Sequence, residues 1–182
     1  MLLLGQGGSG KTHVVQKLVF VAVEFIWPSV SEQEPTLMVV ASSNAQAKNI
    51  SSQQKKARTI HNACCMRVQK MVNARLRPGN KQQALTRLWD KGKVLVIEEI
   101  SMVAAGLYNA LDFRSMYGRS RTHDVHECNY AQIGNAMGRM PIKIELGDFL
   151  QLKPVNNIGL IDDLLAKNDD GSWVHPEMSL AS

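Results

Sequence analysis

The sequence predicts an α/β fold in which helices cover both faces of a mostly parallel sheet. Short apolar runs that suit buried strands alternate with segments of helical periodicity along the 182 residues. A glycine-rich loop follows the first of these runs, and a pair of acids ends a later one. With 45% hydrophobic and 20% charged residues, the chain has the composition of one globular domain with a substantial core.

The first third of the chain predicts a strand, a loop, a helix and a second strand. Residues 2–4 are apolar, and apolar residues between positions 14 and 23 recur at helical spacing until Trp27 and Pro28 end the helix. Residues 36–41 are a short apolar run rich in strand-forming residues, which predicts a buried parallel strand. This order is the opening of an α/β unit.

Helical spacing of apolar residues and short apolar runs also predict the remaining elements. They are a helix over 60–72 with Thr59 as its N-cap, a weaker helix over 82–89, a strand over 94–97, a helix over 107–116, a strand over 142–146 and a last helix over 158–165. The polar segment between the helix over 107–116 and the strand over 142–146 is expected to lie on the surface.

Residues 5–12 read Gly-Gln-Gly-Gly-Ser-Gly-Lys-Thr, a complete G-x-x-x-x-G-K-T phosphate-binding loop. Glycines let the backbone curl so that successive N–H groups point at phosphates, and the following helix adds the positive end of its dipole. A chance glycine-rich turn is the alternative, which the flanking strand and helix disfavour. The residues expected to bind the nucleotide are Gly5, Gly7, Gly8, Ser9, Gly10, Lys11 and Thr12, with Lys11 on the terminal phosphates and Thr12 on Mg²⁺.

Glu98 and Glu99 follow the clearest strand, at the edge of a parallel sheet where ligands bind. A phosphate loop needs one carboxylate to organise magnesium and a second to position the attacking water. Because side chains alternate along a strand, one acid is expected to continue the buried row and the other to turn toward the cleft. The alternative is a solvated pair before a helix. Gln151, four residues past Gly147, is placed to sense a terminal phosphate.

The formal net charge of +5 and the pI near 9.2 favour an anionic partner larger than a nucleotide, although a merely basic surface explains the charge equally well. Three cysteines with no repeated spacing, at 64, 65 and 128, argue for a reducing compartment. His123, His126 and Cys128 lack paired C-x-x-C spacing, so a zinc site is disfavoured. No apolar run reaches membrane-spanning length, so a soluble intracellular protein is expected.

Four blocks, in order, resemble the first motor domain of a superfamily-one DNA helicase of the PIF-one group, which is related to RecD. They are residues 5–12, residues 41–50 with 59–61, residues 96–103 and residues 147–155. The first block is generic and the last two are specific. The resemblance implies a three-layer P-loop NTPase (RecA-like) domain over residues 1–155, followed by a partial C-terminal helix and polar tail over residues 156–182.

The resemblance also implies roles for individual residues. Lys11, Glu99 and Gln151 would act in catalysis with ATP, and Thr12 and Glu98 would hold Mg²⁺. The residues implied to contact single-stranded DNA are Ser42, Ser43, Asn44, Thr59 and His61. Hydroxyl, amide and basic side chains at loop ends give affinity for phosphates and sugars without sequence choice. His61 packing locally at a helix start is the equal alternative.

The chain also departs from the family's pattern. Glu98 stands at a usual aspartate, Asn44 at a usual glycine and Lys153 at a usual proline, and the loop over 51–58 is longer and more basic. Nothing after Val155 resembles the second motor domain, so a truncated helicase is expected. The longer protein would carry that domain.

The function implied is an ATP-dependent DNA helicase of the 5′–3′ type, acting in DNA repair, recombination and telomere maintenance in the nucleus or mitochondrion. One alternative is a nucleotide- and DNA-binding fragment without turnover. Another is a small-molecule kinase that uses the same loop, against which residues 147–155 argue because they stand where an acceptor pocket and lid would be needed.

Overall fold

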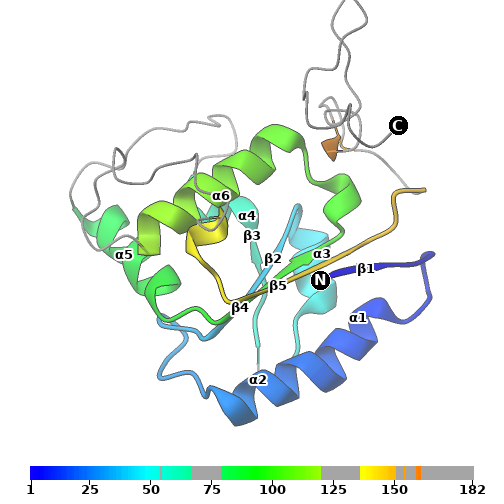
Figure 1. Ribbon diagram of the computed structural model, residues 1–182, viewed down its shortest axis with the longest axis horizontal. Helices are drawn as coiled ribbons and strands as arrows, with labels where there is room; N and C mark the ends of the chain where they lie inside the picture. The colour runs from blue at the N-terminus through cyan, green and yellow to red at the C-terminus, as the bar shows by residue number, and fades with distance from the viewer. Residues whose placement is uncertain (54, 67–78, 120–135, 151–153, 155–158, 161–182) are drawn as a thin grey trace, which may run out of the picture.

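The computed structural model describes residues 1–53, 55–66, 79–119, 136–150, 154 and 159–160 (Figure 1). At its centre is a five-stranded sheet in the order β1-β5-β4-β2-β3, and every neighbouring pair is parallel. The strands are β1 (Leu2–Leu4), β2 (Leu37–Ala41), β3 (Arg58–Thr59), β4 (Val94–Glu98) and β5 (Ile142–Gly147). The predicted α/β fold with a parallel sheet is confirmed.

Helices cover both faces of this sheet, as Figure 1 shows with α1 and α2 on one side and α5 and α6 on the other. A continuous helical rod follows the phosphate loop and contains one turn of π-helix, η1. The rod consists of α1 (Lys11–Val14), η1 (Val15–Val19) and α2 (Phe20–Ile26). The other helices are α3 (Asn44–Ile50), α4 (Ile60–Ala63), α5 (Asn80–Asp90), α6 (Ala105–Arg119) and the short 3₁₀ turns η2 (Ile100–Met102) and η3 (Ala136–Gly138).

Two hydrophobic clusters, one on each face, hold the three layers together. Along β2, Leu37 and Val39 pack with the rod and α3, whereas Met38 and Val40 pack with α4, α5 and α6. β4 alternates in the same way. Both strands are buried along their whole length, so their sequences read as continuous apolar runs rather than as alternating ones.

The structure differs from the expected elements in two places. The helix expected over 60–72 ends at Ala63, because Cys65 adopts a left-handed backbone conformation with φ of 54°; residues 67–78 lie outside the described part. The helix α3 and the two-residue strand β3 were not expected. The last helix, expected over 158–165, falls almost wholly outside the described residues, as do His123, His126 and Cys128.

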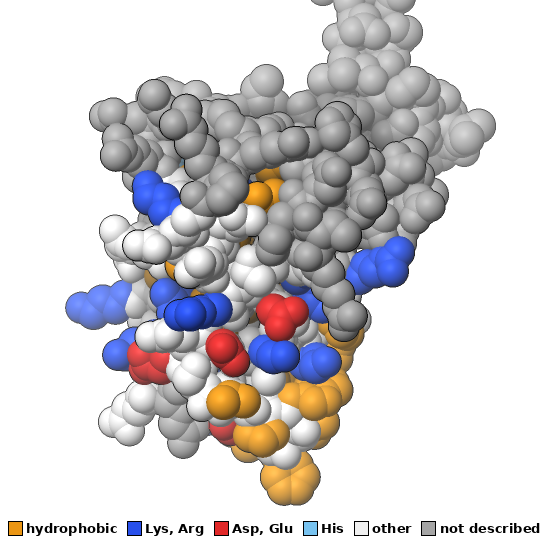
Figure 2. All heavy atoms as spheres, turned by 90° about the vertical axis from the view of Figure 1, so that its left-hand side faces the viewer, with side chains coloured by type: hydrophobic (Ala, Val, Ile, Leu, Met, Phe, Trp, Pro, Cys, Tyr) orange, Lys and Arg blue, Asp and Glu red, His pale blue; other side chains and the backbone are white. Residues whose placement is uncertain are grey.

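One surface of the molecule is unusually apolar. β1 is at the edge of the sheet, and the rod beside it exposes Leu18, Val21 and Phe25, of which Phe25 is 88% exposed. Apolar side chains gather in the lower part of Figure 2, at the level that α2 occupies in Figure 1. None of the described helices combines the length and apolarity needed to cross a membrane.

Candidate nucleotide and nucleic-acid site

The candidate site is at the carboxyl edge of the sheet. Because all five strands are parallel, the residues that follow each strand meet at this one edge. The phosphate loop follows β1, Glu99 follows β4 and Asp148 follows β5, and these three strands are adjacent. The candidate DNA residues follow β2 and β3 on the other side of β4. The strand order therefore divides the site into a nucleotide half and a nucleic-acid half.

The phosphate loop is a compact turn closed by its own backbone. Gly8 and Gly10 have φ of 77° and 84°, a region that side-chain-bearing residues rarely adopt. The Ser9 N–H donates to the Gln6 carbonyl at 3.2 Å, and the Val14 N–H donates to the Gly10 carbonyl at 3.0 Å as the helix begins. The loop and the first helical turn are therefore arranged as an anion-binding end.

Lys11 lies over this loop. Its Nζ donates to the carbonyl oxygens of Gly5, at 2.5 Å, and Gln6, at 3.0 Å. Two carbonyl dipoles hold the ammonium group, and among the described residues it has no carboxylate partner. Its positive charge is therefore available to a phosphate that enters the loop.

Thr12 and Glu98, 86 residues apart in the sequence, are in direct contact. Thr12 Oγ1 donates to Glu98 Oε1 at 2.7 Å. Glu98 is only 5% exposed, and its other oxygen, Oε2, is buried without a hydrogen-bond partner among the described residues. Burial raises the pKa of the Glu98 carboxyl, the Thr12 hydrogen bond opposes that rise, and Glu99 adds to it. A hydroxyl beside a carboxylate with an unpartnered oxygen is a donor set that fits a hard divalent cation such as Mg²⁺.

Glu99 leaves the sheet in a different conformation. Its backbone is left-handed, with φ of 51° and ψ of 58°, and it precedes η2. Its Oε2 is also buried without a partner in the described part of the chain. The two acids thus belong to different backbone regions, Glu98 to the end of β4 and Glu99 to the turn after it.

The end of β5 completes the nucleotide half. The Gly5 N–H donates to the Gly147 carbonyl at 3.3 Å, which places the two loops side by side. A Cβ on residue 147 would lie 2.8 Å from Ile100 Cγ2, so glycine permits β5 and η2 to approach this closely. Asp148 is buried, and its Oδ1 accepts from the Leu150 N–H at 3.0 Å. Gln151 lies outside the described residues.

In the nucleic-acid half, the candidate residues begin two helices. Ser43 caps α3 by accepting from the Gln46 N–H at 3.3 Å, and Thr59 caps α4 by accepting from the Asn62 N–H at 3.2 Å. The predicted capping role of Thr59 is confirmed. Ser42 Oγ donates to Gln46 Oε1 at 2.5 Å. Both helices therefore begin at the carboxyl edge of the sheet.

Asn44 and His61 are the first and second residues of α3 and α4, respectively. Partial burial lowers the pKa of the His61 imidazole, which favours its neutral form. His61 therefore contributes hydrogen-bonding atoms to this half of the site more readily than positive charge.

Sequence reasoning missed Gln46, which connects the two halves. Gln46 Oε1 also accepts from Ser43 Oγ at 3.2 Å, and Gln46 Nε2 lies 2.7 Å from the sulfur of Met102 in η2, the turn that follows Glu99. The signal was present, because Ser43 and Gln46 have the S-x-x-Q spacing of a capping box.

Comparison with known protein families identifies the chain. The family model described as PIF1-like helicase matches residues 1–176. The chain belongs to the PIF1-like helicase family. The resemblance read from the four sequence blocks is thereby confirmed. A comparison with curated proteins gives no match.

Solved structures of PIF1-like helicases share the fold. A Bacteroides Pif1 bound to single-stranded DNA has a TM-score of 0.60 at 20% identity, over 86% of this chain and 30% of that one. Pif1 from Candida albicans has a TM-score of 0.59 at 22% identity, over 89% and 32%. A Bacteroides Pif1 in complex with ADP-AlF3 and single-stranded DNA has a TM-score of 0.58 at 21% identity, over 86% and 30%. The chain spans about a third of the length of these helicases.

Proposed function

We propose that the chain is the first motor domain of an ATP-dependent DNA helicase of the 5′–3′ type, in which ATP hydrolysis drives movement along single-stranded DNA. The observation that carries the proposal is the Thr12–Glu98 contact at the mouth of the phosphate loop. This contact lies at the same sheet edge as the helix starts at Ser43 and Thr59, and Gln46 joins the two regions.

Each residue of the nucleotide half has a proposed task. The N–H groups of the phosphate loop and the Lys11 ammonium bind the phosphates. Thr12 and Glu98 hold Mg²⁺, while Glu99 and Gln151 orient the attacking water and sense the terminal phosphate. When bound, ATP would supply the phosphoanhydride bond that is hydrolysed, and Mg²⁺ would neutralise negative charge on the phosphates.

The nucleic-acid half has the proposed task of contacting single-stranded DNA through Ser42, Ser43, Asn44, Thr59 and His61. Their hydroxyl, amide and imidazole groups suit phosphate and sugar contacts, which carry little sequence information. A second motor domain in a longer protein is the proposed partner that completes the ATP site. DNA repair, recombination and telomere maintenance, in the nucleus or mitochondrion, are the proposed settings.

One observation favours a second candidate, a nucleotide- and DNA-binding protein without turnover. Glu98 stands where the family's pattern usually has aspartate, and its extra methylene would shift the carboxylate relative to Mg²⁺. In that case the same residues bind both ligands, but hydrolysis does not follow.

The deciding experiment measures ATP hydrolysis by the chain with and without single-stranded DNA, beside the Lys11→Ala variant. Because the proposed second motor domain completes the ATP site, we expect only slow turnover from the chain alone, which DNA stimulates and which the variant lacks. Circular dichroism of Lys11→Ala should match the unsubstituted chain, because the hydrogen bonds that the Lys11 side chain makes within the described residues go to carbonyls of its own loop. Magnesium-dependent ATP binding without turnover would favour the second candidate. Absence of ATP binding would contradict both.

A further inference from the structure

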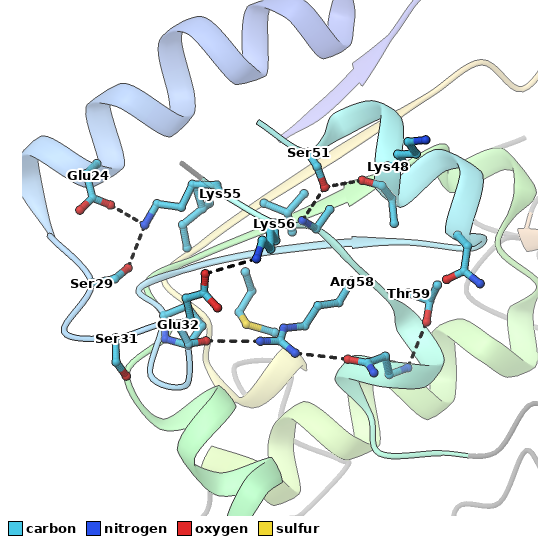
Figure 3. Close-up of a pocket in the computed structure, with 18 residues that line it drawn as sticks. Glu24, Ser29, Ser31, Glu32, Lys48, Ser51, Lys55, Lys56, Arg58 and Thr59 are labelled. Atoms are coloured by element: carbon cyan, nitrogen blue, oxygen red, sulfur yellow. Dashed lines mark hydrogen bonds and ion pairs between the residues drawn. The ribbon is translucent and has the colours of Figure 1, made fainter. Parts of the chain in front are cut away.

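A pocket of about 780 Å³ lies beside the nucleic-acid half of the site (Figure 3). Its walls come from α2, the segment over 29–35, the first three residues of β2, α3 and the chain that leads into β3. This position follows from the strand lengths, because β3 pairs with β2 only at Val40 and Ala41. Within the described part of the chain, Leu37, Met38 and Val39 therefore have no strand beside them on this side, and they line the pocket instead.

The pocket is lined by more cations than anions. Four basic side chains line it, Lys48, Lys55, Lys56 and Arg58, against two carboxylates, Glu24 and Glu32. Three of the cations belong to the loop over 51–58, the segment that is longer and more basic than the family's pattern. Basic and acidic side chains are intermingled across the centre of the face shown in Figure 2.

The two carboxylates neutralise these cations unequally. Lys55 forms an ion pair with Glu24, donates to Ser29 Oγ at 3.0 Å and has a side chain that is only 15% exposed. Lys55 therefore joins the loop over 51–58 to α2, and its charge is already neutralised. Lys56 and Glu32 are 3.7 Å apart and about 80% exposed, and such surface pairs contribute little. Lys56 can therefore leave Glu32 for another anion.

The remaining two cations have no carboxylate partner among the described residues. Arg58 lies across the middle of the view in Figure 3 and donates to the Glu32 carbonyl and to Asn62 Oδ1, each at 3.3 Å. These neutral acceptors orient the guanidinium without cancelling its charge. Lys48 is exposed on α3. The pocket thus carries uncompensated positive charge.

The pocket is continuous with the candidate DNA residues, because Asn44 and Thr59 line it as well. None of the residues that line it is aromatic, whereas Ser29, Ser31 and Ser51 supply hydroxyl groups. Such a lining offers no aromatic surface on which a base can stack, but it suits phosphates and sugars.

We propose that this pocket binds the sugar–phosphate backbone of single-stranded DNA as the strand continues past Asn44 and Thr59, with Lys48, Lys56 and Arg58 as its phosphate contacts. The inference rests on the proposed function, and it adds a second, purely electrostatic segment to the DNA path. The pocket is expected to raise affinity without adding sequence preference.

The test measures binding of fluorescent oligo(dT) at several salt concentrations to the unsubstituted chain and to Lys48→Gln/Lys56→Gln. Both lysines are exposed, so the substitutions should leave folding intact. The matched control is Lys17→Gln/Lys91→Gln, which removes the same charge from exposed positions outside the pocket. For single strands, each lost phosphate contact lowers the slope of log K against log salt by about 0.7. We expect a decrease of about 1.4 for the pocket pair and a much smaller one for the control pair.

Equal slopes for the pocket and control pairs would overturn the inference, even if the unsubstituted chain binds DNA. Failure of the unsubstituted chain to bind oligo(dT) would instead overturn the DNA-binding part of the proposed function, and the inference with it. A third arm adds tripolyphosphate at constant ionic strength. Tripolyphosphate can displace DNA through the pocket only where DNA occupies it, so greater displacement from the unsubstituted chain than from the pocket pair supports the proposal. Tripolyphosphate binding that the pocket pair loses, while its oligo(dT) slope stays equal to that of the control pair, would show a pocket for free phosphates and overturn it.

Discussion

Gln16 Nε2 lies 3.0 Å from the carbonyl oxygen of Ile50, the last residue of α3. The same nitrogen is 3.2 Å from the carbonyl of Asn49 and 3.3 Å from that of Ser51. The final carbonyls of a helix have no partner within it, so this one amide caps α3. Gln16 belongs to η1, one turn beyond Thr12. The helical rod that follows the phosphate loop is thereby joined to α3, the helix that begins in the nucleic-acid half of the candidate site.

Gln16→Ala should destabilise the fold, because it leaves these carbonyls without their donor. We expect a loss of about 1–2 kcal/mol in the free energy of unfolding, measured by urea denaturation. Gln16→Glu keeps the shape but replaces the donor with an acceptor, so it should cost more than alanine. Equal stability of Gln16→Glu and the unsubstituted chain would contradict the capping role.

Glu98→Gln should separate metal binding from stability. The substitution keeps an acceptor for Thr12 but removes the charge that attracts Mg²⁺, so Mg²⁺-dependent ADP binding should weaken about tenfold or more. Because burial raises the pKa of the Glu98 carboxyl, the neutral amide should leave the melting temperature unchanged or higher. Calorimetric titration of ADP at several Mg²⁺ concentrations measures the first effect, and thermal melting the second. An unchanged Mg²⁺ requirement would remove Glu98 from the metal site.

Ser43→Asp should distinguish capping from DNA contact. Aspartate caps helices as well as serine does, so stability should change by less than about 0.5 kcal/mol. Its negative charge would repel phosphates, so oligo(dT) affinity should fall. Ser43→Ala is the companion variant and should lose about 1 kcal/mol of stability through the missing cap. If Ser43→Asp binds DNA as tightly as the unsubstituted chain, Ser43 does not lie on the DNA path.

The stability of the domain should fall in alkaline solution through Cys64. Burial raises the pKa of this thiol from 9.0 to about 12 in the folded state, an effect that Arg114 only partly opposes. The unfolded chain therefore releases the proton first, and the stabilisation present below pH 9 is lost as the pH rises from 9 toward 12. Cys64 should contribute up to about 1.4 kcal/mol per pH unit to the decrease in the free energy of unfolding.

Urea denaturation across this pH range checks the Cys64 prediction, with Cys64→Ala as the comparison. The variant should start from lower stability, because it loses buried contacts, but its stability should depend less steeply on pH. Identical slopes for the two proteins would assign the alkaline loss to other groups, such as Tyr108, whose pKa burial also raises to about 12.

Long apolar runs and a complete motif made much of this fold predictable from sequence. The strand over 94–97 is buried along its whole length, the strand over 142–146 is buried at Ile144 and Leu146, and the phosphate loop lies between a strand and a helix as expected. The helix α3 escaped prediction because only Ala47 and Ile50 of its seven residues are buried, which is too few for a clear periodicity. β3 is two residues long and exists only through its pairing with β2.

The site was predictable in composition but not in its contacts. The phosphate-loop motif predicts a role for Thr12, and the position of Glu98 after a strand predicts one for Glu98. No spacing rule, however, predicts contact between two residues 86 positions apart. Their contact depends on the strand order, in which β5 separates β1 from β4. The left-handed conformation of Glu99 is likewise a tertiary property, since glutamate has no intrinsic preference for it. Gln16 belongs to no sequence motif. Its capping role could not be predicted, because it depends on where α3 ends in the folded structure.

The exposed apolar strip formed by Leu18, Val21 and Phe25 should make self-association of the chain depend on salt concentration. Salt screens the repulsion between copies that carry a net charge of +5, and it does not weaken apolar contact. Salt also weakens every phosphate contact. High salt, which would weaken the proposed DNA contacts, therefore also favours association through the exposed apolar strip. Purification should accordingly remove nucleic acid by some means other than ionic strength.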